Sequence, residues 1–127
     1  MKRVLAALLV VLAVCGAAAS QEAKKSERKQ FIYVLKLTPR LLAAKNWTEQ
    51  DEQIVGRHFR RLQQLHKEGR VLLAGRTLNE SDPSQFGVVV FEAADEDEAR
   101  KVMEADDAVR EKIMTAQLFP FSVALIK

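Results

Sequence analysis

The residue of this sequence with the clearest capacity for chemistry is His58. Each residue of an α-helix advances by about 100°, so a helix over residues 54–68 places His58 near the centre of one apolar face. The other members of that face are Ile54, Val55, Phe59, Leu62 and Leu65. An ionisable side chain is not expected in such a position. Because imidazole changes its charge near neutral pH, a histidine there can serve as a general acid or base, whereas the structural alternative is a core histidine bonded to a backbone carbonyl.

The remaining polar residues predict neither a metal site nor a bound cofactor. His66 lies at the edge of the same helix face, and no clear third ligand accompanies the two histidines. A zinc site uses about three or four ligands, so we expect no metal. The sequence has no Gly-rich phosphate loop and no nucleophile elbow, and nothing in it marks a haem pocket. Arg57, Arg60 and Arg61 form a basic run that we interpret as a solvated helix face.

The elements that must position His58 are four predicted strands and two predicted helices. Apolar and β-forming residues are concentrated in the segments 31–37, 70–75, 86–92 and 117–126, which we predict as strands. Thr48 and Asp51 form a capping pair that starts the first helix, and Gly69 ends it. Asp95 and Glu98 form a second capping box, which opens the second helix.

The order of these elements predicts the fold class. A loop containing Trp47 joins the first strand to the first helix, and the second helix ends near residues 105–107, before a further helical turn at 108–112. The predicted order of strands and helices is β-α-β-β-α-β, which is the ferredoxin-like arrangement of an α+β domain.

The predicted sheet has two apolar faces. In the first strand, the side chains alternate between Phe31, Tyr33, Leu35 and Leu37 on one face and Ile32 and Val34 on the other. The helices can cover only one face, and an antiparallel sheet with a solvated face alternates with polar residues. The second face therefore needs a cover. Two protomers packed sheet to sheet supply one, so we predict a homodimer.

Residues 1–20 have the organisation of a secretory signal peptide. Its parts are Lys2 and Arg3, the apolar run 4–14 and the small residues 17–19. Cleavage is predicted near Ala19 or Ser20, and the apolar run is shorter than the roughly 20 residues that a membrane span needs. A competing interpretation makes Cys15 the lipid-bearing first residue of a bacterial lipoprotein. Both interpretations predict an exported protein, periplasmic or secreted.

Residues 21–29 are polar without apolar periodicity, so we interpret them as a disordered linker that precedes one domain at 30–127. Ordinary cleavage removes the sole cysteine, which excludes disulfides and thiolate sites from the mature domain. The chain has 20 basic and 17 acidic residues, and the loss of Lys2 and Arg3 leaves 18 against 17, a net charge of +1. We therefore expect no nucleic-acid partner.

The helix with His58 and the segment 69–75 together resemble the YCII-related family of small dimeric α+β barrel proteins. The family pattern has a histidine early on the first helix and then an apolar strand that ends in Ala-Gly, and His58 stands 17 residues before Gly75. A second landmark of the family is an aspartate that closes the second helix, and it corresponds to Asp106. The segment 119–121 is similar to the family's closing Pro-aromatic strand. The resemblance covers roughly residues 30–124.

The resemblance implies that His58 and Asp106 form the site. The family's paired histidine and aspartate have been taken to imply enzymatic function, and at least one relative is associated with dehydrochlorination of an aromatic ring. A carboxylate that fixes one imidazole nitrogen leaves the other as a base, whereas the alternative for Asp106 is a helix-terminal residue in a turn. Two positions depart from the family pattern, because Arg76 stands where many members have proline and Asp107-Ala108 replaces a Pro-aromatic pair. A changed pocket wall indicates a changed substrate or a lost activity.

These observations predict an exported YCII-like homodimer with a small pocket between sheet and helices, lined by His58 and Asp106. The first hypothesis is an enzyme that uses this pair for general acid–base chemistry on a small organic molecule, the reaction being unassigned. The alternative is a non-catalytic small-ligand-binding or accessory homodimer on the same fold.

Overall fold

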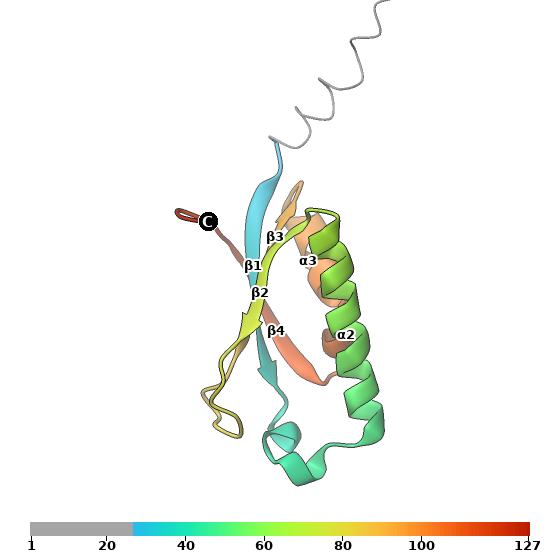
Figure 1. Ribbon diagram of the computed structural model, residues 1–127. Helices are drawn as coiled ribbons and strands as arrows, with labels where there is room; N and C mark the ends of the chain where they lie inside the picture. Colours follow the sequence, from blue (N-terminus) through green and yellow to red (C-terminus); the bar gives the residue numbers. More distant parts are fainter. Residues whose placement is uncertain (1–26) are drawn as a thin grey trace, which may run out of the picture.

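A computed structural model describes residues 27–127 of the chain (Figure 1). The predicted signal peptide, Cys15 and most of the predicted linker lie outside the described residues. The elements in chain order are β1 (Lys29–Leu37), the 3₁₀ turns η1 (Pro39–Leu42) and η2 (Ala44–Asn46), α2 (Glu49–Lys67), β2 (Val71–Arg76), β3 (Gly87–Ala93), α3 (Glu96–Glu104), α4 (Asp107–Arg110) and β4 (Met114–Pro120). Between residues 27 and 127, no helix has the length and apolar character needed to cross a membrane.

The strands form one antiparallel sheet in the order β2-β3-β1-β4. Figure 1 shows α2 and α3 on the same side of this sheet, with the other side uncovered. This order of strands and helices is the ferredoxin-like α+β arrangement. The predicted fold class is therefore confirmed.

The helix that carries His58 is fixed at both ends by local interactions. The Thr48 hydroxyl accepts a hydrogen bond from the Asp51 N–H at 3.1 Å, and the Asp51 carboxylate accepts one from the Thr48 N–H at 3.0 Å. Arg40 adds hydrogen bonds of 2.8 and 2.9 Å to Asp51, and these hold the pKa of that carboxyl far below its usual range. Gly69 ends the helix with a φ of 77°, a conformation that glycine adopts without strain. Both predicted ends of α2 are thus confirmed.

The core fills the space between the sheet and the helices. Phe31, Tyr33 and Leu35 of β1 point into it, and the Tyr33 ring meets the Phe91 ring edge-on at a centroid distance of 5.5 Å. The residues of α2 that are buried are Asp51, Ile54, His58, Leu62 and Leu65. His58 therefore lies on the buried face of α2, as its position in the apolar pattern predicts.

Three local predictions need correction. Phe59 was expected on the apolar face but is 59% exposed, because the buried stripe of α2 is narrow and Phe59 lies beside it. The last strand was predicted over 117–126, but β4 begins at Met114 and ends at Pro120, since its ladder with β1 runs from Leu37 to Phe31. At α3, the Asp95 carboxylate caps the helix as expected, but Glu98 accepts from the N–H of Ala94 and not from that of Asp95.

The side of the sheet that faces away from the helices has an apolar cluster at its centre. Ile32 pairs with Val90 across β1 and β3, and Val90 pairs in turn with Leu73 of β2. Leu73 is 51% exposed, and Phe119, which is the partner of Ile32 on β4, is 40% exposed. We refer to Ile32, Leu73, Val90 and Phe119 as the open face.

Candidate functional site

His58 and Asp106, which are 48 positions apart in the chain, meet in the structure. The ring nitrogen Nδ1 of His58 lies 2.6 Å from Oδ1 of Asp106. α2 presents His58 toward the sheet, and the turn between α3 and α4 presents Asp106 toward α2. His58 is 8% exposed and Asp106 is completely buried.

The Asp106 carboxylate receives hydrogen bonds from three different parts of the chain. Besides the contact of Oδ1 with His58, that oxygen accepts a bond of 3.0 Å from the N–H of Ala108, which caps α4. Oδ2 accepts a bond of 2.8 Å from the hydroxyl of Tyr33 on β1. Asp106 is therefore both a helix-terminal residue and the partner of His58, so the two interpretations of its role are compatible.

This environment keeps Asp106 ionised. Burial by itself raises the pKa of the carboxyl group, but the hydrogen bonds from His58, Tyr33 and Ala108, with the charge of His58, outweigh it and hold the pKa below its usual value. An ionised carboxylate only accepts hydrogen bonds. Nδ1 of His58 must therefore carry the proton of the short contact, and in the neutral ring Nε2 is left as the acceptor.

Tyr33 is the member of this network that sequence reasoning did not identify. The sequence pattern placed it only on one face of the first strand. Its ring packs in the core, and its hydroxyl donates to Asp106. Burial and, next to it, the negative charge of Asp106 raise the pKa of Tyr33 far above its usual value, so the phenol stays a donor. Its inward position in the alternation of β1 was a usable signal, because a buried tyrosine hydroxyl generally needs a partner.

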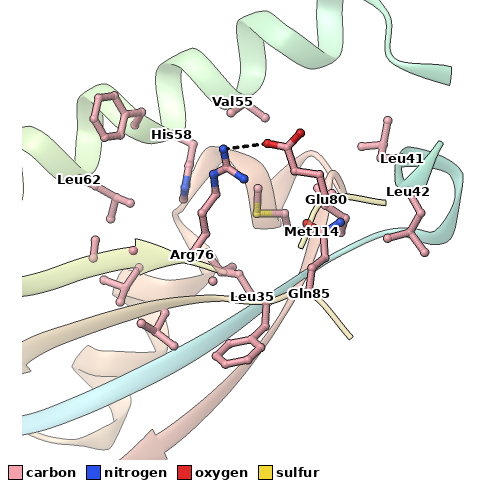
Figure 2. Close-up of a pocket in the computed structure, with 18 of the residues that line it drawn as sticks. Leu35, Leu41, Leu42, Val55, His58, Leu62, Arg76, Glu80, Gln85 and Met114 are labelled. Atoms are coloured by element: carbon pink, nitrogen blue, oxygen red, sulfur yellow. Dashed lines mark hydrogen bonds and ion pairs between the residues drawn. The ribbon is translucent and has the colours of Figure 1, made fainter. Parts of the chain in front are cut away.

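A cavity of about 550 Å³ lies beside His58, between α2, the 3₁₀ turns and the ends of β2 and β3. Figure 2 shows His58 pointing from α2 toward this space, which Leu62, Leu35 and Met114 also line. Such a volume falls within the range of small-molecule pockets, roughly 300–1,000 Å³. Trp47 also lines the cavity, and the N–H of its indole donates to the Leu41 carbonyl at 2.8 Å.

The lining of this cavity corrects one expectation. The pocket was predicted to be lined by both His58 and Asp106, but Asp106 does not reach it and has no exposed surface. His58 links the two, because its Nδ1 contacts the carboxylate and its side chain lines the cavity. Asp106 can act on a bound molecule only through His58, as a positioning residue.

The polar residues at the mouth of the cavity come from the end of β2 and the loop that follows it. Arg76 and Glu80 form an ion pair with an N–O distance of 3.3 Å, which Figure 2 shows as a dashed line. Gln85 and Ser81 also line the mouth. Sequence reasoning flagged Arg76 as a changed pocket wall, and it does lie in the wall.

The other sequence candidates lie away from the cavity. His66 is exposed, and its Nδ1 contacts the Val71 carbonyl at 2.9 Å. Of the basic run on α2, Arg61 is half-buried and donates to the Val102 carbonyl, whereas Arg60 is exposed. Within residues 27–127, no cluster of three or more His, Cys, Asp or Glu side chains is arranged to hold a metal ion.

Two comparisons bear on this geometry. The family model of the YCII-related domain matches residues 30–122, a range that contains both members of the His58–Asp106 pair and nearly all of the sheet. No curated protein matches the chain at a significant level.

Proposed function

This chain belongs to the YCII-related domain family, and from that premise we propose that it acts on a small organic molecule by general acid–base chemistry. His58 is the reacting group, and Asp106 is its positioning residue. The observation that carries the proposal is the contact of 2.6 Å between His58 Nδ1 and a buried, ionised Asp106, made by a histidine that also lines an apolar cavity.

In the proposed mechanism, one proton is transferred to and from Nε2 of His58. Nε2 of the neutral imidazole accepts a proton from a substrate held in the cavity, and the positive charge that forms on the ring is stabilised by Asp106. Tyr33 and the Ala108 N–H hold the carboxylate in place by hydrogen bonds to its two oxygens. The protonated ring then returns the proton as a general acid. The apolar lining keeps water away and strengthens these charge interactions.

The alternative function is binding without turnover. It is favoured by the same cavity, whose lining is mainly apolar and offers few polar groups beside His58. In a binding protein, Nε2 of His58 serves as a fixed hydrogen-bond acceptor for the ligand, and no proton is transferred.

The experiment that tests the enzymatic proposal compares wild type with His58→Gln. Small acidic and aromatic compounds are screened for turnover by the purified protein. Glutamine keeps an amide N–H for the buried carboxylate, so the fold is retained, but it cannot exchange a proton near neutral pH. We expect turnover to fall by about 100-fold or more.

His66→Gln is the matched control, because His66 is exposed and lies outside the cavity. Turnover by this variant should equal that of wild type. If His58→Gln keeps wild-type turnover, the proposed role of His58 is wrong. If wild type binds a compound at His58 without converting it, the binding function is correct.

We also propose that the protein is exported and acts as a homodimer. The signal-like residues 1–20 support export, with a lipid anchor at Cys15 as the competing form. The apolar open face supports the dimer, because a second copy of the sheet would cover it.

A further inference from the structure

Arg76 lies in the wall of the cavity because of the register of the sheet. In the antiparallel pairing of β2 and β3, Ala74 stands opposite Val89 and Arg76 opposite Gly87. Val89 is buried in the core on the helix side. Alternation along β2 therefore turns both Ala74 and Arg76 toward α2. Figure 2 shows the Arg76 side chain rising from β2 toward that helix.

Gly87 is the residue opposite Arg76 on β3, and it also lines the cavity. Gly87 has no side chain, and a Cβ placed there would lie 3.9 Å from the Cβ of Arg76 and 3.3 Å from the Gly75 carbonyl oxygen. The cavity wall next to Arg76 therefore includes backbone at Gly87, with the Leu35 side chain beside it.

The guanidinium of Arg76 has unused hydrogen-bonding capacity. It carries five N–H donors, and within residues 27–127 the structure gives it one hydrogen bond, of 3.3 Å, to Glu80. The side chains of Arg76 and Glu80 are 59% and 72% exposed, so the pair is weak and screened by salt. By contrast, Arg40 holds Asp51 with two bonds of 2.8 and 2.9 Å.

Arg76 is also the single arginine or lysine among the described residues that line the cavity. The remaining wall is mainly apolar, and Glu80 is its one carboxylate. A ligand without charge would leave Arg76 unused, whereas a carboxylate matches the planar fork of its N–H groups.

We propose that Arg76 is an anion-binding residue and that the molecules taken up by this cavity are apolar carboxylates, with the carboxylate on Arg76 and the apolar body directed toward His58. Glu80 competes with the ligand for the guanidinium and weakens its binding. The inference rests on the proposed use of the cavity, and it adds the chemical class of the ligand.

The test uses a matched pair of probes, 2-naphthoate and its neutral analogue 2-naphthamide. Binding is measured by calorimetry, and its location by the shift of the His58 imidazole signals in NMR spectra. Wild type should bind 2-naphthoate at least about tenfold more tightly than 2-naphthamide, because only the former offers a charged partner to Arg76. Arg76→Gln should remove this preference and leave the binding of 2-naphthamide unchanged.

Glu80→Gln should tighten the binding of 2-naphthoate, since it removes the competing carboxylate. Arg60→Gln is the control, because Arg60 is an exposed arginine of α2 outside the cavity, and it should change neither probe. Equal binding of both probes by wild type, or an equal loss of both in Arg76→Gln, overturns the inference. So does a failure of 2-naphthoate to shift the His58 signals. None of these outcomes decides the proposed function, which is tested separately by the turnover of wild type and of His58→Gln.

Discussion

At the scale of single residues, one buried carboxylate joins three parts of the molecule. Asp106 accepts hydrogen bonds from His58 on α2, from Tyr33 on β1 and from the N–H of Ala108 in α4. Each donor satisfies part of a charge that has no contact with solvent. The orientation of the His58 ring is therefore tied to the packing of the sheet and to the start of α4. A substitution of Tyr33 should therefore change the orientation of the His58 ring, although Tyr33 lies on β1 and His58 on α2.

Replacing Tyr33 with phenylalanine removes one donor from Asp106 and keeps the ring in the core. Leaving a buried charged acceptor short of a partner should lower the free energy of unfolding by about 1–3 kcal/mol. Urea denaturation at pH 7, followed by circular dichroism, measures this difference. A variant as stable as wild type contradicts an energetic role for the hydrogen bond.

The difference in the free energy of unfolding between wild type and Tyr33→Phe should depend on pH, and the direction of this dependence can be worked out. The pKa of Asp106 is lowered in the folded protein, so its contribution to stability is present above the pKa of an unfolded aspartate, about 3.9. It is lost as the pH falls through the lower folded pKa. Tyr33→Phe raises the folded pKa of Asp106, because the lost bond favoured the charged form. The stability gap between wild type and variant should thus be full at neutral pH and narrow below about pH 4. A gap that stays constant with pH would argue against a bond to an ionised carboxylate.

At the scale of elements, the ends of a helix or strand could be predicted from sequence where they are set by interactions between residues close together in the chain. α2 could be predicted at both ends, because Thr48, Asp51 and Gly69 act on their own neighbours. β4 could not, because its ends are set by pairing with β1, where Leu37 faces Met114 and Phe31 faces Pro120. Those partners are distant in sequence. Because the residues after Pro120 are mainly apolar, the strand was predicted to extend to residue 126, beyond its observed end.

The same distinction applies to the site. His58 could be found from sequence because it interrupts an apolar pattern on its own helix. Asp106 was suggested only by the resemblance, since an aspartate in a turn is common. The alternation of β1 indicates that the Tyr33 hydroxyl needs a partner, but the bond spans 73 positions, and no local pattern identifies Asp106 as that partner. The apolar cavity depends on the packing of several elements and on the absence of side chains at glycines such as Gly87.

Thr48→Ala tests how far the start of α2 depends on its cap. The substitution removes the hydroxyl that accepts the Asp51 N–H and should lower the free energy of unfolding by about 1 kcal/mol. Thr38→Ala is the matched control, because Thr38 precedes η1 but its side chain makes no capping hydrogen bond. Urea denaturation of both variants should show the loss for Thr48→Ala only. Equal losses would mean that the capping bond is not the cause.

At the scale of the whole molecule, the helices cover one face of the sheet, and no helix of residues 27–127 covers the other (Figure 1). Val89 faces the helices and belongs to the core, whereas its neighbour Val90 faces away and is screened by Ile32 and Leu73 in the adjoining strands. Leu73 and Phe119 remain about half exposed on the open face. A contiguous apolar surface of this kind is typical of an interface.

The proposed dimer can be tested at Leu73 without disturbing the core of the protomer. Because Leu73 is 51% exposed, a glutamate at this position stays solvated in a monomer. In a sheet-to-sheet dimer the same charge is buried without a partner, at a cost on the order of several kcal/mol. Leu73→Glu should therefore dissociate the dimer at micromolar concentration, as measured by sedimentation, while its circular dichroism stays that of wild type.

Leu78→Glu provides the control for the added charge. Leu78 is 80% exposed in the loop after β2, outside the open face, so this variant should sediment like wild type. A wild-type protein that is monomeric at micromolar concentration would refute the dimer directly. A Leu73→Glu variant that remains dimeric would show that any dimer uses another surface, and the apolar side chains of the open face would then need a different partner.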